Sequence, residues 1–164
     1  MIMNMKTKYQ EAAASKVRFC YDKYPISYLK KLIYDKNKEI WNEKWRSYDK
    51  GLVTKKFIPT IYYRHEIKKH FETDFYLTQL ITNHGRFKDY LTRFKLMDDK
   101  NYDQCQEVED YNHVIFYCNK YEEEMAPLIE TVLENKNVWP CNQSILLSKN
   151  IFNTFKTFCN NVFA

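Results

Sequence analysis

The sequence predicts a mainly α-helical protein, built as one small domain. Apolar residues recur at three- and four-residue steps along most of the chain, which is the period of an amphipathic helix. Only 2 of the 164 residues are glycine and 4 are proline, so tight turns are few and an all-β sandwich is disfavoured. Two glycines also exclude the glycine-rich phosphate loops of nucleotide-binding enzymes.

Length and composition fit a single domain with one sizeable core. We divide the chain into a leader or linker, residues 1–24, and one helical domain, residues 25–164. The five cysteines are odd in number and scattered, unlike a secreted disulfide framework. No stretch has the apolar length of a signal peptide or of a membrane-spanning helix. We therefore expect an intracellular protein, nuclear or cytoplasmic, without a membrane partner.

The charge is distributed unevenly along the chain. Residues 1–100 carry 22 Lys and Arg against 12 Asp and Glu, whereas residues 101–164 carry 4 against 9. A basic first part favours a polyanionic partner, above all nucleic acid. An AT-biased genome favours Lys, Asn, Tyr, Ile and Phe and produces a similar Lys-rich surface, so the charge alone leaves both explanations open.

The first predicted helix covers residues 27–51. Ser27 fits its N-cap and Gly51 fits a C-terminal glycine. Its apolar stripe consists of Leu29, Leu32, Ile33, Ile40, Trp41 and Trp45. The two tryptophans are predicted to be core anchors rather than base-stacking platforms. Residues 52–59 are predicted to be extended.

Three further helices are predicted over residues 60–71, 72–84 and 86–96. In the second, Thr73 is the expected N-cap, and the apolar face consists of Phe75, Leu77, Leu80 and Ile81. Gly85 permits the left-handed backbone that reverses the chain. In the third helix the residues expected inside are Phe87, Tyr90, Leu91 and Phe94.

The second and third of these helices predict a hairpin with one cationic face. Basic residues interleaved with aromatic ones suit contacts to a nucleic-acid backbone and its bases. The candidate nucleic-acid-binding residues are Arg64, Lys68, Lys69, Arg86, Lys88, Arg93 and Lys95. A solvated charged face shows the same pattern.

Residues 96–110 are polar and acidic and predict a loop, followed by a short apolar run at 111–117. A helix is predicted over 124–136, with Pro127 in its first turn, where a missing N–H is tolerated. Asn150 is the expected cap of a last helix. Its predicted buried residues are Ile151, Phe152, Phe155, Phe158, Cys159, Val162 and Phe163, and Cys141 is likewise predicted to be a packing residue.

Cys105, His113 and Cys118 form a Cys-x7-His-x4-Cys motif, the part of the sequence most typical of chemistry rather than packing. A structural zinc site needs four tetrahedral ligands, usually thiolates and imidazoles. The position three residues before Cys105, where a fourth ligand is expected, is Tyr102, a poor zinc ligand. The predicted fold is therefore a small helical domain with a degenerate zinc-knuckle loop.

Two interpretations of this loop remain open. Three ligands hold zinc weakly, with water, Asp103 or His84 completing the site. Alternatively the knuckle has lapsed, and its histidine and second cysteine pack against Phe116 and Tyr117. The missing cysteine at position 102 favours the second interpretation.

An ordered series of motifs runs from residue 41 to about residue 122. It consists of Trp41-x3-Trp45-x-Ser47, Gly51-x2-Thr54, Ile58-Pro59, Leu77-Thr78-Gln79-Leu80, Asn83-His84-Gly85-x-Phe87-x2-Tyr90-Leu91 and Cys105-x7-His113-x2-Phe116-x-Cys118. This series resembles the C-terminal region of insect-type non-LTR retrotransposon polyproteins, downstream of the reverse transcriptase and of any RNase H domain. Asn83 and Tyr102 depart from the glycine and the first cysteine of the family pattern.

The resemblance implies a segment that helps to bind template RNA or target DNA during target-primed reverse transcription, with Cys105, His113 and Cys118 as knuckle ligands. We expect no catalytic activity from the chain itself, because it lacks the polymerase's Tyr-x-Asp-Asp, and no small-molecule substrate. The alternative is a protein–protein interaction module derived from a retroelement, which would bind with little dependence on salt.

A metal-dependent hydrolase built on His65, Glu66 and His70 is a third hypothesis. The zincin motif needs two histidines four residues apart, so that both face the metal from one side of a helix. Here the two histidines are five residues apart, which disfavours this hypothesis.

Overall fold

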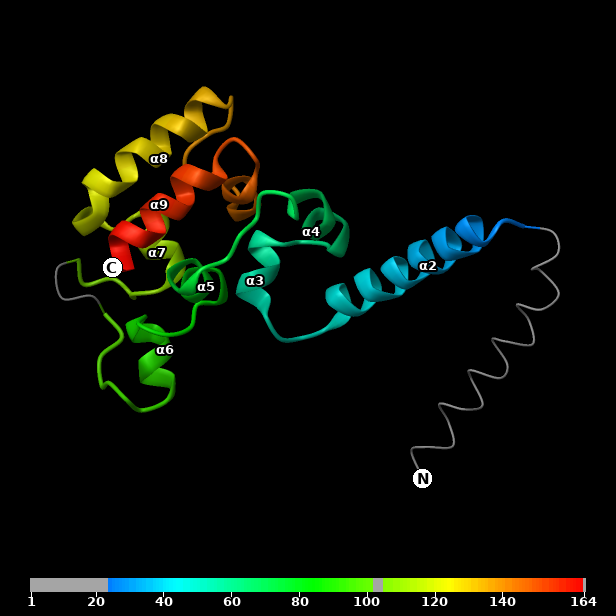
Figure 1. Ribbon diagram of the computed structural model, residues 1–164. Coiled ribbons are helices and arrows are strands. Elements are labelled where there is room, and N and C mark those ends of the chain that lie inside the picture. Colours follow the sequence, from blue (N-terminus) through cyan, green and yellow to red (C-terminus); the bar gives the residue numbers. More distant parts are fainter. Residues whose placement is uncertain (1–23, 102–104, 164) are drawn as a thin grey trace. The chain divides into compact units, whose positions relative to one another are not determined.

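The computed structural model describes residues 24–101 and 105–163, and every regular element in these ranges is a helix (Figure 1). The prediction of a mainly helical protein is thus confirmed. The chain forms two compact units, residues 1–43 and 44–164. The predicted leader, residues 1–24, lies almost wholly outside the described residues, as do Tyr102 and Asp103, and the predicted domain boundary stays a prediction.

In the described ranges no helix has both the length and the apolar character needed to cross a membrane.

Helix α2 (Ile26–Ser47) begins one residue before the predicted N-cap Ser27, because the Pro25 carbonyl oxygen accepts the first backbone hydrogen bonds. It ends well before Gly51. The whole of this helix is described, and none of its side chains is buried. Trp41, predicted to be a core anchor, is 60% exposed, so that prediction is wrong.

Trp45 is the member of the α2 stripe that meets the core of the second unit. Its side chain is half-buried against that core, and its Nε1 donates a hydrogen bond to the Ile58 carbonyl oxygen at 2.9 Å. The prediction of a core anchor is therefore right for Trp45. The indole N–H finds an acceptor, as a buried tryptophan usually does.

Helix α3 (Leu52–Phe57) replaces the extended segment predicted for residues 52–59. Gly51 precedes it in the left-handed conformation, with φ of 67°, and so begins this helix instead of ending the previous one. Val53 and Phe57 lie four residues apart and face the core, where Phe57 is fully buried. Six residues are too short a run to distinguish this period from an extended strand.

Helix α4 (Ile61–Ile67) is capped by Thr60, whose Oγ1 accepts from the Tyr63 backbone N–H at 3.0 Å. Helix α5 (Phe75–Thr82) is capped by Asp74 and not by Thr73. The Asp74 carboxylate accepts from the Leu77 N–H at 2.8 Å. The predicted apolar face of α5 is buried at Leu77, Leu80 and Ile81, but Phe75 is 71% exposed.

Helix α6 (Lys88–Arg93) is shorter than predicted. Phe87 before it is fully buried, whereas Phe94 after it is exposed, contrary to the prediction. The predicted loop follows, described at residues 96–101 and 105–110, and it leads to α7 (Tyr111–Phe116) and the short 3-10 helix η1 (Asn119–Tyr121).

The last part consists of α8 (Glu122–Glu134), the 3-10 helix η2 (Gln143–Leu147) and α9 (Phe152–Phe163). Helix α8 starts earlier than predicted, so Pro127 is its sixth residue and not part of its first turn. Three glutamates in that first turn suit the positive end of the helix dipole.

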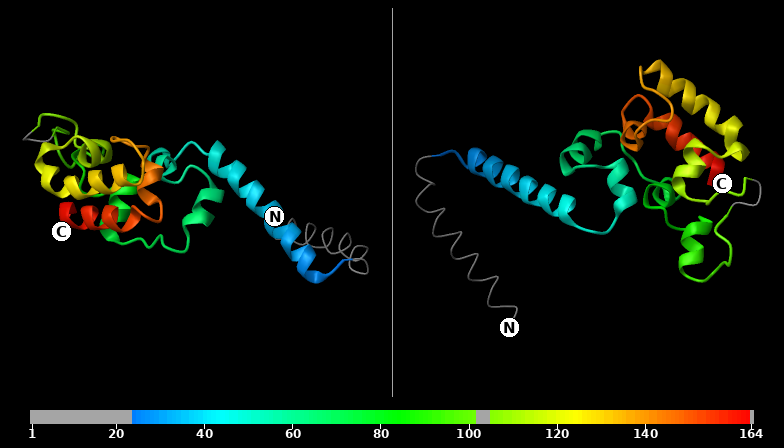
Figure 2. Two further views of the ribbon diagram at one scale, coloured as in Figure 1. Left: turned by 90° about the horizontal axis from the view of Figure 1, so that it is seen from above. Right: turned by 180° about the vertical axis from the view of Figure 1, so that it is seen from behind.

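Helix α9 packs against α5, α8 and η2 at the centre of the second unit, and α8 runs beside it in both figures (Figures 1 and 2). All but one of the residues predicted to be buried there are buried, and Val162 is half-buried. Asn150 caps no helix; its side chain donates to the Asn135 side-chain oxygen at 3.0 Å. Cys141 and Cys159 are buried packing residues, as predicted.

Candidate metal centre

Helix α7 holds His113 in place through two side chains that bind its N-terminus. Asp110 is its N-cap, and the Asp110 carboxylate accepts from the His113 backbone N–H at 2.8 Å. Asn83, which is buried, accepts from the Tyr111 N–H at 2.9 Å through its amide oxygen. Asn83 has φ of 54° at the end of α5. The departure from glycine at position 83 therefore supplies a hydrogen bond that links α5 to the helix bearing His113.

Gly85, two residues later, is required for two separate reasons. Its φ of +94° lies in the region that favours glycine, and a Cβ there would fall 2.1 Å from Gln79 Oε1. Gln79 is buried, and the same oxygen accepts from the Arg86 backbone N–H at 3.1 Å. The packing of Gln79 against this turn is a structural role that the sequence did not reveal, because glutamine is usually a surface residue.

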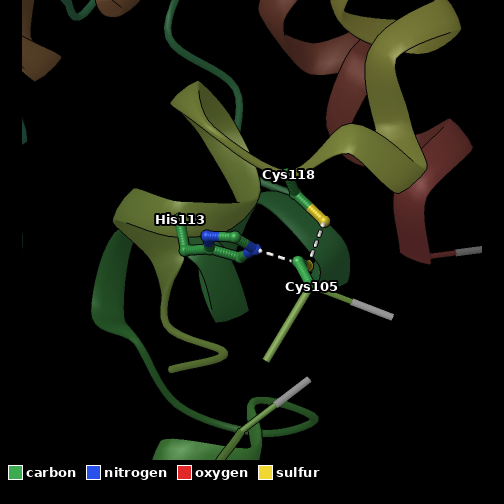
Figure 3. Close-up of side chains that lie close together, drawn as sticks. All are labelled: Cys105, His113 and Cys118. Carbon is green, nitrogen blue, oxygen red and sulfur yellow. Dashed lines mark hydrogen bonds between the residues drawn. The ribbon is translucent and has the colours of Figure 1, made fainter. Parts of the chain in front are cut away.

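The structure brings Cys105, His113 and Cys118 together (Figure 3). Cys105 Sγ lies 3.1 Å from His113 Nε2 and 3.9 Å from Cys118 Sγ. The three donor atoms all lie within 4.8 Å of one another. A tetrahedral ion bound at about 2.3 Å to sulfur and about 2.0 Å to nitrogen separates two sulfurs by about 3.8 Å and sulfur from nitrogen by about 3.5 Å. The cluster can therefore hold a metal ion.

The cluster is largely shielded from solvent. His113 is 8% exposed and Cys118 only 1%, whereas Cys105 is half-buried. Burial, together with a smaller effect of the neighbouring Cys105, raises the pKa of the Cys118 thiol to about 11. The backbone N–H groups of Lys120 and Tyr121 act in the opposite sense, because they donate to this sulfur and favour its thiolate form.

In the described part of the chain, no fourth His, Cys, Asp or Glu joins the cluster. His84, one candidate for the fourth ligand, instead contacts the Tyr90 ring at a centroid distance of 4.8 Å. Cys105 and His113 line an open pocket of about 650 Å³ together with five polar residues, Glu107, Asp110, Asn112, Tyr117 and Asn119, and Val108. One side of the cluster thus meets solvent.

The lapsed-knuckle interpretation expects the histidine and second cysteine to pack against Phe116 and Tyr117. Phe116 packs against Trp139, with ring centroids 4.9 Å apart, and Tyr117 is 56% exposed. His113 Nε2 meets the Cys105 sulfur instead. This contact is a hydrogen bond, at a separation that also permits a shared metal ion.

Three of the candidate cations of the hairpin are engaged within the chain. The Arg86 guanidinium donates to the Phe163 carbonyl oxygen at the end of α9. Lys88 Nζ donates to the Asn101 carbonyl oxygen at 3.0 Å. Arg93 forms an ion pair with Asp89 at 3.1 Å, one helical turn away. These side chains connect segments of the fold as well as carrying charge.

The other candidate cations are three exposed lysines and one half-buried arginine. Lys68 and Lys69 follow α4 directly and are exposed, as is Lys95 after α6. The Arg64 guanidinium is half-buried and lies 5.1 Å from the centroid of the Phe71 ring. Contacts within the chain, and not exposure, therefore distinguish Arg86, Lys88 and Arg93 from the other four, since Arg86 and Arg93 are themselves exposed.

The histidines of the zincin hypothesis do not converge. His70 lies beyond the end of α4, and its Nε2 is 3.0 Å from the Leu147 carbonyl oxygen. Among the described residues, neither His65 nor His70 belongs to a group that could hold a metal ion.

A segment of 95 residues, 57% of this chain, is 33% identical to a retrovirus-related Pol polyprotein from type-1 retrotransposable element R1 2 of Nasonia vitripennis. The matched segment is 23% of the length of that polyprotein. No protein-family model and no solved structure matches the chain. The chain is thus similar to part of a retrotransposon polyprotein.

Proposed function

We propose that this chain is a nucleic-acid-binding segment of the C-terminal region of a non-LTR retrotransposon polyprotein, and that its Cys/His loop holds one zinc ion. The observation that carries the proposal is the convergence of Cys105, His113 and Cys118, whose donor atoms all lie within 4.8 Å of one another, with Cys105 Sγ 3.1 Å from His113 Nε2 and 3.9 Å from Cys118 Sγ. The similarity to a retrotransposon polyprotein supports the same assignment. In this role the chain binds and positions nucleic acid inside the cell and catalyses no reaction itself.

The chain's own residues prepare the site for an ion. Both thiols lose a proton when they bind zinc, and the N–H groups of Lys120 and Tyr121 stabilise the thiolate of Cys118. Asp110 fixes the turn of α7 from which His113 projects. An ion held by Cys105, His113 and Cys118 would connect the loop before α7 to the segment after it.

Exposed cations supply the contacts to RNA or DNA. Lys68, Lys69 and Lys95 are exposed, and they contribute most because they neutralise phosphates without breaking a hydrogen bond of the fold. Arg86, Lys88 and Arg93 contribute less, since each already binds a group of this chain. The expected contribution of Arg64 is intermediate, because its guanidinium already lies against the Phe71 ring.

The test is binding of the full chain to a fluorescent RNA and to a DNA duplex, at salt concentrations between about 50 and 200 mM. Wild-type affinity should fall steeply with salt, and Lys68→Ala/Lys69→Ala should weaken binding and flatten that dependence. A control, Lys120→Ala/Lys136→Ala, removes the same charge from exposed positions in the acidic part of the chain. Equal losses in both variants would reject the assigned surface.

Zinc is tested on the same material by metal analysis. One equivalent should copurify with the wild type and none with Cys118→Ser, because that substitution removes a buried thiolate ligand. Nucleic-acid binding that persists without zinc would separate the two parts of the proposal. Salt-insensitive association with a protein, and no affinity for RNA or DNA, would favour the alternative of a retroelement-derived interaction module.

A further inference from the structure

Helix α2 presents a second chemical pattern besides its aliphatic stripe. Tyr28, Lys31, Tyr34, Lys38 and Trp41 follow one another at steps of three, three, four and three residues, so they share one face of the helix. We call these five residues the aromatic–lysine stripe. Aromatic and basic side chains alternate along it.

Two aliphatic residues of α2, Ile33 and Ile40, lie outside the stripe. At 100° per residue, each points about 80° or more away from every member of the aromatic–lysine stripe. Both are themselves exposed, at 55% and 41%. The helix thus offers two different surfaces, and they provide matched positions for comparison.

The aromatic rings of the stripe are accessible. Tyr28 is 45% exposed, Tyr34 50% and Trp41 60%. Lys31 is exposed, and Lys38 Nζ lies 5.9 Å from the centroid of the Tyr34 ring. Rings of this size left half open to water, with cations beside them, are unusual for a face that only covers a core.

The charge of the helix favours an anionic partner. Six Lys and Arg residues stand against three Asp and Glu residues between Ile26 and Ser47. Glu39 is paired with Lys36 at 3.0 Å. Asp35 lies within the stripe itself, four residues after Lys31, so the excess of positive charge belongs to the helix as a whole. A protein seam through the stripe would bury Lys31 and Lys38, which is costly unless each meets a carboxylate. Phosphate groups, in contrast, can pair with Lys31 and Lys38 while the lysines remain hydrated.

We propose that the aromatic–lysine stripe is a binding face for single-stranded nucleic acid. Unpaired bases stack on Tyr28, Tyr34 and Trp41, while Lys31 and Lys38 neutralise phosphates between them. From Tyr28 to Trp41 the stripe is about 20 Å long at 1.5 Å per residue, which suits a short single strand. A duplex hides its bases and gains only the charge contacts. This face extends the proposed nucleic-acid role to a surface that needs neither zinc nor Lys68 and Lys69.

The first measurement is binding of the full chain to a fluorescent oligouridine, followed by anisotropy and by tryptophan emission. Stacking on Trp41 should quench the emission, and Trp41→Leu should lose that quenching while Trp45 and Trp139 remain. Tyr34→Ala/Trp41→Ala should weaken binding at least about tenfold, because each stacked base contributes roughly that factor or more. The control Ile33→Ala/Ile40→Ala, outside the stripe, should bind as the wild type does.

The lysines are tested separately with a matched pair. Lys31→Ala/Lys38→Ala should reduce the salt dependence by about 0.7 per lost phosphate contact. Lys36→Ala/Lys44→Ala removes the same charge from the same helix outside the stripe and should change it less. Alanine favours helix, so far-UV circular dichroism should show all four double variants folded.

The outcomes separate this inference from the function proposed above. If Tyr34→Ala/Trp41→Ala and Lys31→Ala/Lys38→Ala bind as tightly as the wild type, and Lys68→Ala/Lys69→Ala does not bind, the inference is wrong. The proposed function would then still hold. Absence of binding to any RNA or DNA overturns both. If the stripe variants instead dissociate an oligomer in sedimentation experiments, the stripe is a protein interface and the inference is wrong.

Discussion

Helices α2 and α9 have similar apolar periods, but the apolar residues of α9 are buried and those of α2 are not. In α9, Phe155, Phe158 and Cys159 are at most 2% exposed, because α5, α8 and η2 cover that face. In α2, Ile33 and Trp41 are more than half exposed, and no side chain is buried. The period identifies which residues share a face, and the presence of a packing partner decides whether the face is buried.

The strongest test of this difference compares one truncation in each helix. Phe155→Ala should lower the free energy of unfolding by about 3–5 kcal/mol, since it leaves a cavity in a closed core. Ile33→Ala should change it by less than about 0.5 kcal/mol, because the side chain is already half in water. Urea unfolding followed by circular dichroism gives both values. Similar losses in the two variants would show that α2 has a packing partner.

The comparison extends to the candidate metal centre, which lies in the packed unit. Free zinc at a hundred times its dissociation constant should stabilise the wild type by about 2.7 kcal/mol, because only the folded cluster gathers the ligands. A chelator should reverse the effect, and Cys118→Ser should abolish it. Cys141→Ser serves as the control for loss of a buried thiol outside the cluster. Equal stabilisation of Cys118→Ser would place zinc elsewhere.

Gly51 and Gly85 allow an open turn to be compared with a packed one. Gly51→Ala should cost about 1 kcal/mol, since only the left-handed backbone is strained and nothing lies within 4 Å of the new Cβ. Gly85→Ala should cost about 2 kcal/mol or more, because the Cβ also displaces Gln79 from its bond to Arg86. Thermal unfolding measures both, and a Gly51→Ala loss as large as that of Gly85→Ala would contradict the role given to Gln79.

Much of the second unit could be predicted from local pattern alone. The buried face of α9, the buried face of α5 at Leu77 and Leu80, and the left-handed turn at Gly85 follow from period and glycine chemistry. Helix α3 was missed because six residues show too little period. The error at Ser27 arose because a proline carbonyl can begin a helix as well as a serine can.

The candidate site shows where sequence pattern stops being informative. Spacing identified Cys105, His113 and Cys118, but only the fold shows that their donor atoms meet. The contacts that position them join distant residues, such as Asn83 to Tyr111, and no local motif encodes such a pair. The hairpin cations were grouped by charge, whereas the structure shows Arg86 and Lys88 bonded to carbonyl groups far along the chain.

The smallest expected effect concerns a phenol inside the packed unit. Burial, and to a smaller extent the negative charge of Glu66, raises the pKa of Tyr63 to about 12. Below pH of about 10 both folded and unfolded chains keep the proton, so its contribution to stability is fully present. Between about pH 10 and 12 the unfolded chain ionises first, and that contribution is lost.

Tyr63→Phe should therefore lose less stability than the wild type between about pH 9 and 11, as read from urea midpoints. The variant starts lower at pH of about 9, because the hydroxyl donates to the Ser144 carbonyl oxygen and that bond contributes about 1 kcal/mol. Tyr28→Phe removes a phenol from the exposed stripe of α2 and controls for ionisation elsewhere. If wild type and Tyr63→Phe instead lost stability in parallel as the pH rose, burial would not protect the Tyr63 phenol. The buried tyrosine of the second unit would then not differ in this respect from the exposed tyrosines of α2.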